Sequence, residues 1–195
     1  MIKKIDKIIL LVGLMGSGKT SVGKRLAKKL NLPFVDGDQE IEKAAGLSLV
    51  DVLKCFGEEE YRAGEKRVMK RLLQGAPCVL ASGGGSFVAE QTRELAKIHA
   101  ITVWLKADVD VLYNRTAGRK HRPFLEGDDS HLKNKLEKYI SEEYPIIPKQ
   151  ILWSKPEKNR LITRFSALLT PLTIFFHPKK PLKQRFFCVW RNILC

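Results

Sequence analysis

The most constraining feature of the sequence is a hydrophobic run that leads directly into a glycine-rich octet. Residues 8–12, Ile-Ile-Leu-Leu-Val, are typical of a buried strand, and residues 13–20 read Gly-Leu-Met-Gly-Ser-Gly-Lys-Thr, which fits the pattern G-x-x-x-x-G-K-[ST]. Glycines in such a loop let successive backbone N–H groups converge on an anion, and a following helix adds the positive end of its dipole. That helix is predicted because Val22, Leu26 and Leu30 share one face. The octet therefore predicts a P-loop that binds the phosphates of a nucleotide.

Two side chains of the octet have predicted roles in this chemistry. Lys19 would reach the β- and γ-phosphates of the nucleotide, which makes it a catalytic candidate. The hydroxyl of Thr20 would be a ligand of Mg²⁺, a hard ion that accepts one or two protein oxygens beside phosphate and water. The sequence therefore predicts Mg²⁺ as the cofactor, with ATP as a substrate.

A pair of carboxylates follows the second predicted strand. Phe34 and Val35 form the end of that strand, and Asp36 and Asp38 come directly after it. Residues i and i+2 point the same way from a strand end, at the edge where open α/β sheets bind ligands. We therefore expect both carboxylates to lie at that edge.

Two further segments have the composition of binding loops. The strand at residues 79–81 leads into Ser82-Gly83-Gly84-Gly85, and three consecutive glycines cost conformational entropy unless something approaches the backbone closely. Residues 115–130 are polar and basic, as in a lid that closes over a triphosphate and supplies a guanidinium to the transferring phosphoryl group. An ordinary glycine-rich loop and a solvated basic loop remain the alternatives for these two segments.

Strands and helices alternate along residues 1–147, which predicts an α/β fold with a central parallel sheet between two layers of helices. Further helices are expected at residues 39–45, 49–56, 58–73, 89–100 and 131–141, and a fourth strand at 101–105. The hydrophobic runs are too short to cross a bilayer, and no signal-like segment stands at the N-terminus. The sequence therefore predicts a soluble, cytoplasmic protein without a membrane partner.

Charge is distributed unevenly along the 195 residues. The net charge is +14, but residues 1–150 hold 26 Lys and Arg against 20 Asp and Glu, whereas residues 151–195 hold nine against one. A mildly basic body needs no nucleic acid to explain it, because ATP and an anionic substrate are polyanions themselves. The four cysteines show no C-x-x-C spacing, so neither a zinc site nor a disulfide framework is predicted.

In this order and spacing, the motifs resemble those of the shikimate kinases, small P-loop kinases of the nucleoside-monophosphate-kinase type. The resemblance covers residues 1 to about 147. It rests on the P-loop with Ser21-Val22-Gly23, Phe34-Val35-Asp36-Gly37-Asp38, Phe56-Gly57-Glu58 through Tyr61-Arg62 to Glu65, Ser82-Gly83-Gly84-Gly85, and Arg122-Pro123-Phe124-Leu125 in the lid. It implies a kinase domain at 1–147, a lid at about 115–130, and an atypical segment at 148–195.

The resemblance also implies site roles. The residues implied to bind ATP are Gly16, Ser17, Gly18, Lys19, Thr20, Ser21 and the lid residue Arg122, which would also be catalytic. Asp36 would assist Mg²⁺ through its water shell, and Asp38 would orient or deprotonate the 3-hydroxyl of shikimate. Arg62 would pair with the shikimate carboxylate, and Gly83, Gly84 and Gly85 would bring backbone N–H groups against the substrate.

The sequence departs from the family in two places. Glu143 stands where the family has an arginine that binds the substrate carboxylate, and Ile147 replaces a tyrosine. Such a glutamate would repel the substrate, although Lys138 or Lys149 could compensate. Beyond Ile147 no family strand is recognisable, and residues 151–195 contain no glycine but seven of the 16 aromatic residues. A shifted reading frame, a basic and aromatic extension that binds a partner, or a pair of C-terminal helices would each explain this segment.

The function implied by the resemblance is ATP-dependent phosphorylation of the 3-hydroxyl of shikimate in the pathway to the aromatic amino acids. Another small-molecule P-loop kinase, similar to gluconate kinases, is the nearest alternative. A nucleotide-binding protein with impaired turnover comes next, and a nucleic-acid-binding module is the most distant. A compact kinase of this size is expected to be a monomer with ATP and shikimate as its small-molecule partners.

Overall fold

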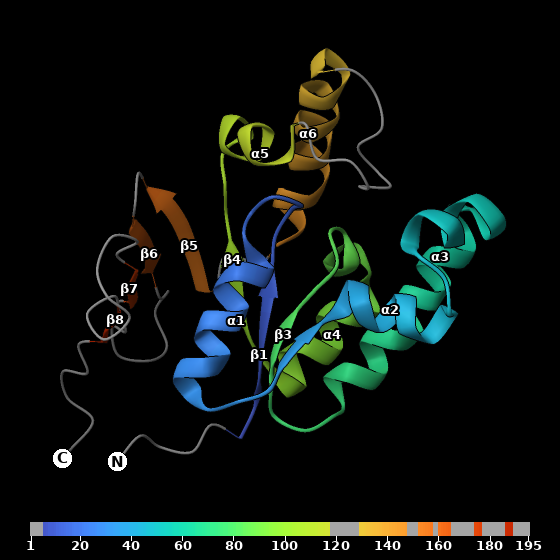
Figure 1. The fold of residues 1–195 in the computed structure, drawn as a ribbon. Coiled ribbons are helices and arrows are strands. Elements are labelled where there is room, and N and C mark those ends of the chain that lie inside the picture. Colours follow the sequence, from blue (N-terminus) through green and yellow to red (C-terminus); the bar gives the residue numbers. More distant parts are fainter. Residues whose placement is uncertain are drawn as a thin grey trace.

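The computed structural model describes residues 6–117 and 129–147 and, beyond them, the backbone of four strands (Figure 1). The strands are β1 (Ile8–Val12), β2 (Phe34–Asp36), β3 (Val79–Ala81), β4 (Ala100–Leu105), β5 (Leu152–Glu157), β6 (Arg160–Arg164), β7 (Ile174–Phe176) and β8 (Phe186–Cys188). The helices are α1 (Lys19–Leu30), α2 (Gly37–Ala45), α3 (Leu49–Leu73), α4 (Glu90–His99), α5 (Val109–Thr116) and α6 (Asp129–Glu143), with 3-10 turns η1 (Ser86–Val88) and η2 (Tyr144–Ile146). The predicted alternation of strands and helices is confirmed.

The first five strands form a parallel sheet in the order β2-β3-β1-β4-β5. Because these strands are parallel, their carboxyl ends lie at one edge of the sheet. The P-loop, the residues after β2 and the glycine segment after β3 follow three neighbouring strands and therefore meet at this edge. The sheet topology thus explains how motifs that are far apart in sequence come together.

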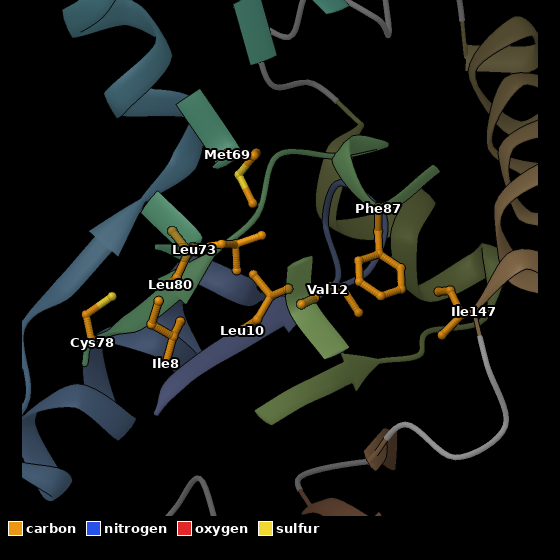
Figure 2. Packing of buried hydrophobic residues seen from close by; sticks show 10 residues of the cluster. Ile8, Leu10, Val12, Met69, Leu73, Cys78, Leu80, Phe87 and Ile147 are labelled. Atoms are coloured by element: carbon orange, nitrogen blue, oxygen red, sulfur yellow. The ribbon is translucent and has the colours of Figure 1, made fainter. Parts of the chain in front are cut away.

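Strand β1 is buried on both faces of the sheet, and all five of its residues belong to the core. Ile8, Leu10 and Val12 pack in a cluster with Met69 and Leu73 of α3 (Figure 2). The alternate residues Ile9 and Leu11 pack on the opposite side with Ala27 of α1 and its partly buried neighbours Val22, Leu26 and Leu30. The period of two along a strand thus directs the residues of β1 alternately into two layers of helices, which confirms the predicted three-layer α/β/α fold.

Helix α3 contains the two helices that were predicted on either side of Gly57. The backbone of Gly57 has φ 80° and ψ 175°, which interrupts the helix. Ser48 is the N-cap, and its hydroxyl accepts a hydrogen bond from the backbone N–H of Asp51 at 3.2 Å. The second half of α3 then carries Arg62 and Glu65 toward the carboxyl edge of the sheet.

Helices α5 and α6 lie beyond the carboxyl ends of β1 and β4 (Figure 1). Leu14 of the P-loop is fully buried in a cluster with Leu112 of α5 and with Leu132 and Leu136 of α6. This second hydrophobic cluster packs the P-loop against α5 and α6, so the loop is held by apolar packing as well as by its own backbone hydrogen bonds.

The region after Ile147 differs from what the sequence predicted. No further strand was recognised there, but β5 pairs in parallel with β4, and β6, β7 and β8 continue the sheet with antiparallel pairing. Pro156 lies within β5 and lacks a backbone donor, which argues against a strand in sequence reasoning. The alternative of a C-terminal helix pair is also wrong for these residues.

Among the helices that the structure describes, none is long and apolar enough to cross a membrane.

We predict that Leu10→Ala lowers the free energy of unfolding by about 2–5 kcal/mol, because a fully buried side chain would be replaced by a cavity between β1 and α3. Urea unfolding followed by circular dichroism measures this change. The matched control is Ile98→Ala, since the side chain of Ile98 in α4 is 65% exposed and its loss should cost less than about 0.5 kcal/mol. Equal effects of the two substitutions would contradict the burial of Leu10 between β1 and α3.

Candidate active site

The P-loop joins β1 to α1 in a conformation that depends on glycine. Gly16 has φ 81°, in the left-handed region, and a Cβ atom at this position would lie 2.8 Å from Cγ2 of Thr116. The hydroxyl of Ser17 is buried and has no hydrogen-bond partner among the described residues. Ser21 is exposed in the first turn of α1. These positions follow from the loop turning back over the end of β1.

The two side chains predicted to act on phosphate and metal both have defined contacts. The ammonium of Lys19 donates to the backbone oxygens of Gly13 at 2.6 Å and Leu14 at 3.2 Å, so it lies against the loop. The hydroxyl of Thr20 donates to Oδ2 of Asp36 at 3.0 Å. This pair offers two adjacent hard oxygens, which is the donor set that suits Mg²⁺ beside phosphate and water. Elsewhere in the described residues, no cluster of three or more acidic, His or Cys side chains could hold a metal ion.

Asp36 and Asp38 come together, but in a different way from the prediction. They do not both extend from a strand end, because α2 begins at Gly37 and Asp36 is its N-cap. Oδ1 of Asp36 accepts the backbone N–H of Asp38 at 3.2 Å. The reason is the strong N-cap preference of aspartate: Asp36 is both the last residue of β2 and the N-cap of α2, so the helix begins two residues earlier than predicted. Asp38 thereby lies in the first turn of α2.

The carboxyl of Asp38 has a perturbed protonation equilibrium. Burial raises its pKa from 3.8 to about 6, and the neighbouring carboxylates of Asp36, Glu65 and Glu42 add to the rise, whereas the positive charge of Lys19 opposes it. A carboxyl group with a pKa in this range can accept a proton near neutral pH. Raised carboxyl pKa values beside a phosphate-binding loop are typical of functional sites.

The guanidinium of Arg62 is held in place by the buried carboxylate of Glu65. Its Nη1 donates to Oε2 of Glu65 at 2.9 Å, while Oε1 of Glu65 accepts hydrogen bonds from Ser86 at 2.6 Å and from Tyr61 at 3.4 Å. The side chain of Glu65 is 4% exposed and that of Arg62 is 30% exposed. Glu58 makes a longer contact with the same guanidinium, at 3.4 Å. Glu65 therefore holds the guanidinium of Arg62 in one orientation at the border of the site.

The glycine segment after β3 joins these groups into one site. A Cβ atom at Gly83 would lie 2.6 Å from Oδ1 of Asp38 and 2.9 Å from Oε1 of Glu65. A Cβ atom at Gly85 would lie 3.2 Å from Nη1 of Arg62, and one at Gly84 would lie 3.5 Å from Met15. The close approach predicted for the triple glycine is thus an approach of carboxylate and guanidinium side chains to the backbone.

Sequence reasoning missed two groups of the site and placed one differently. Ser86, buried and bonded to Glu65, carries no sequence signal, and Glu65 was recognised only as part of the family motif that contains Arg62. Arg115, expected at the start of the lid, lies in the last turn of α5 and contacts the backbone oxygens of Gly16 at 3.4 Å and Ser17 at 3.5 Å. Its role could not be read from the sequence, because the contact spans about a hundred residues. The lid residue Arg122 lies outside the described residues.

Glu143 lines a small cavity beside these groups. The cavity is bounded by the P-loop, the glycine segment and the end of α6, through residues Gly13, Ser82, Gly83, Gly85, Phe87, Val88, Glu143 and Ile147. Burial raises the pKa of Glu143 from 4.5 to about 7, against the opposing effects of Lys19 and Arg62. The residue that departs from the family pattern therefore faces the same site as Gly83 and Gly85.

A P-loop beside a buried carboxylate, at the carboxyl edge of a parallel sheet with helices on both faces, places this protein in the class of α/β P-loop kinases. The sequence model of the family described as "Shikimate kinase" matches residues 15–159. The chain is 49% identical over 144 residues to a shikimate kinase of Paramagnetospirillum magneticum, covering 73% of this chain and 72% of that protein. It therefore belongs to the shikimate kinase family.

Two further proteins agree with this assignment. A shikimate kinase of Mesorhizobium japonicum is 44% identical, with 72% of this chain and 68% of that protein covered. The structure of a shikimate kinase from Acinetobacter baumannii in complex with shikimate matches with a TM-score of 0.74 and 33% identity, over 80% of this chain and 86% of that chain. The family match extends twelve residues beyond Ile147, where the motifs in the sequence ended.

We predict that Gly83→Ala lowers the melting temperature by roughly 3–10 °C, because the new methyl group would displace the carboxylates of Asp38 and Glu65 or shift the backbone, at a cost of about 1–3 kcal/mol. Gly64→Ala is the matched control, since Gly64 lies in α3 and a Cβ atom there would come no closer than 3.8 Å to Arg67. Differential scanning calorimetry distinguishes the two variants. An unchanged melting temperature in Gly83→Ala would mean that the segment is not as crowded as described.

Proposed function

We propose that this protein transfers the γ-phosphoryl group of ATP to the 3-hydroxyl of shikimate. The observation that carries the proposal is the position of Asp38, whose half-buried side chain lies against Gly83. Its pKa is raised to about 6, although the positive charge of the P-loop Lys19 lowers it. A proton acceptor is thereby placed next to a phosphate-binding loop. The relatives named shikimate kinase, at 49% and 44% identity, support the choice of reaction and of substrate.

ATP would bind with its phosphates on the P-loop. The backbone of Gly16, Ser17 and Gly18 and the first turn of α1, with Thr20 and Ser21, would donate to the phosphate oxygens. Lys19 would exchange its contacts with the loop carbonyls for the β- and γ-phosphates. Arg122 of the lid would add positive charge on the transferring group, which is a proposal from the sequence alone.

Shikimate would bind between Asp38, Arg62 and the glycine segment. The guanidinium of Arg62, held by Glu65 at 2.9 Å, would pair with the substrate carboxylate. Backbone N–H groups of Gly83, Gly84 and Gly85 would contact the ring. This arrangement would direct the 3-hydroxyl toward Asp38 and the P-loop.

The chemistry then needs one proton transfer and one exchange of phosphorus–oxygen bonds. Asp38 would accept the proton of the 3-hydroxyl while that oxygen forms a bond to the γ-phosphorus, and the bond to the β–γ bridging oxygen breaks to leave ADP. Phosphoryl transfer has a loose transition state, so the protein contributes mainly alignment and charge neutralisation. Mg²⁺, when bound, would supply further neutralisation of the phosphate charge, held by Thr20 with Asp36 acting through a water ligand.

Three features of the proposal remain predictions about this chain. The use of Mg²⁺, the monomeric state and the cytoplasmic location are each inferred from the family and from the sequence. A gluconate-kinase-like activity would appear as ADP release with a sugar acid in place of shikimate. A nucleotide-binding protein with impaired turnover would bind ATP but release no ADP with any of these substrates.

We predict that Asp38→Asn lowers kcat with shikimate by about 10²–10⁴-fold, because the amide cannot accept the hydroxyl proton. The affinity for ATP should change little, since Asp38 does not contact the P-loop backbone. A coupled assay of ADP release measures kcat, and Asp110→Asn, at a side chain that is 73% exposed on α5, is the matched control. If Asp38→Asn retained full kcat, Asp38 would not be the base.

We also predict that Arg62→Ala raises the KM for shikimate by about 10–100-fold, the loss expected for a charge-assisted hydrogen bond, with the KM for ATP unchanged. Arg71→Ala is the control, since Arg71 also pairs with a glutamate, Glu40 at 2.8 Å, but on the surface of the protein. Arg62→Lys should fall between wild type and Arg62→Ala, because lysine keeps the charge without the planar fork. An equal rise in both KM values would place Arg62 outside the shikimate site.

A further inference from the structure

The end of α6 carries a carboxyl group into the wall of the substrate site. Glu143 is the last residue of α6, is half-buried, and lines the cavity that also contains Gly83 and Gly85. Its position is set by the residues that follow it in the chain. The hydroxyl of Tyr144 donates to the backbone oxygen of Ala107 at 2.6 Å, and Ile147 is buried in the same cluster as Phe87 (Figure 2). Glu143 is therefore held in the cavity by rigid neighbours.

Charged groups face Glu143 from several elements. Lys19 of α1 and Arg62 of α3 favour its ionised form, whereas Glu65 of α3 and the adjacent Glu142 oppose it. The phenols of Tyr139 and Tyr144 also lie within its electrostatic reach. Of the two cations, Arg62 already contacts Glu65 and Glu58, and Lys19 contacts the P-loop carbonyls. The described part of the site is thus rich in carboxylates before any anion binds.

We infer that Glu143 is a specificity-determining residue of this enzyme: its carboxylate weakens the binding of a carboxylate-bearing substrate, and its protonation relieves that repulsion. This inference rests on the proposed function, because it assumes that the substrate carboxylate binds beside Arg62. The ionised form of Glu143 would compete with the substrate carboxylate for the positive charge of Arg62. The neutral form would instead present a hydroxyl donor to the substrate.

The direction of the pH dependence follows from linkage. With a pKa of about 7, Glu143 is mostly neutral at pH 6 and mostly ionised at pH 8. If the ionised form repels the substrate, the KM for shikimate rises as the pH rises through this range. The rise is about tenfold if the bound substrate shifts the pKa of Glu143 by one unit. Conversely, the bound anion favours the neutral form, so binding takes up protons from solution near pH 7.5.

The experiment compares the wild type with Glu143→Gln and Glu143→Arg over pH 6–8.5, with Glu142→Gln as the matched control. Glu142 neighbours Glu143 in sequence but its side chain is 55% exposed, outside the cavity. In the wild type, the KM for shikimate should rise about tenfold across the range. In Glu142→Gln the rise should be of similar size but begin at lower pH, because Glu142 opposes the ionised form of Glu143. In Glu143→Gln it should stay low and nearly constant, and in Glu143→Arg it should be lower still. Any titration of Asp38 is common to all four proteins and cancels in the comparison.

Two probes make the test independent of protein stability and of turnover. The methyl ester of shikimate carries no carboxylate charge, so its KM should be the same in the wild type and in Glu143→Gln. Calorimetric titration of shikimate in buffers of different ionisation enthalpy should show proton uptake in the wild type and much less in Glu143→Gln. Proton uptake that is equal in the two proteins, or a KM ratio that is the same for acid and ester, would overturn the inference.

Failure of the inference differs from failure of the proposed function. Turnover of shikimate by the wild type with an unchanged profile in Glu143→Gln would overturn only the role of Glu143. No turnover by the wild type, but turnover by Glu143→Arg, would support the inference and locate the impairment at this residue. Neither turnover nor calorimetric binding of shikimate in any of the four proteins would overturn both.

Discussion

The whole site depends on the burial of β1 between two layers of helices. Because Leu10 and Leu11 face opposite layers and both are fully buried, the strand can neither slip in register nor tilt without exposing apolar side chains. The P-loop begins where this strand ends, and Leu14 is buried in turn under α5 and α6. The position of the phosphate-binding backbone is therefore a consequence of hydrophobic packing, to which the glycines add only the local turn.

A second constraint is the buried carboxylate of Glu65. A carboxylate with 4% exposure is stable only when its oxygens are satisfied, and here Ser86, Tyr61 and Arg62 satisfy them. The same contacts connect α3 to the turn after the glycine segment and orient the guanidinium. Glu65 thus acts as a positioning residue for Arg62, and the proposed geometry of substrate recognition depends on a group that is not expected to touch the substrate.

The difference between what the sequence predicted and what it did not has a physical basis. The P-loop, the parallel strands and the segment around Arg62 were predictable because they rest on local patterns of glycine, alternation and helical spacing. The N-cap geometry of Asp36 was not, since the strand pattern and the capping preference compete over the same residue. Ser86 and Arg115 were also not predictable as site residues, because their contacts join segments distant in sequence. Strand β5 was missed because Pro156 breaks the expected strand pattern. The position of β5 in the sheet is set by its parallel pairing with β4, which lies far from it in sequence.

The charge balance of the site links its two ends. Lys19 faces both Asp38 and Glu143, and its positive charge lowers the pKa of each of these carboxyls. When triphosphate occupies the P-loop, the charge of Lys19 is shared with phosphate oxygens, and its effect on both carboxyls weakens. Their pKa values should then rise together, which makes Asp38 a stronger proton acceptor and leaves Glu143 more often neutral. In the proposed substrate pocket, Glu143 is thus least repulsive to an anion in the state that is ready for phosphoryl transfer, and catalysis is compatible with a glutamate at this position.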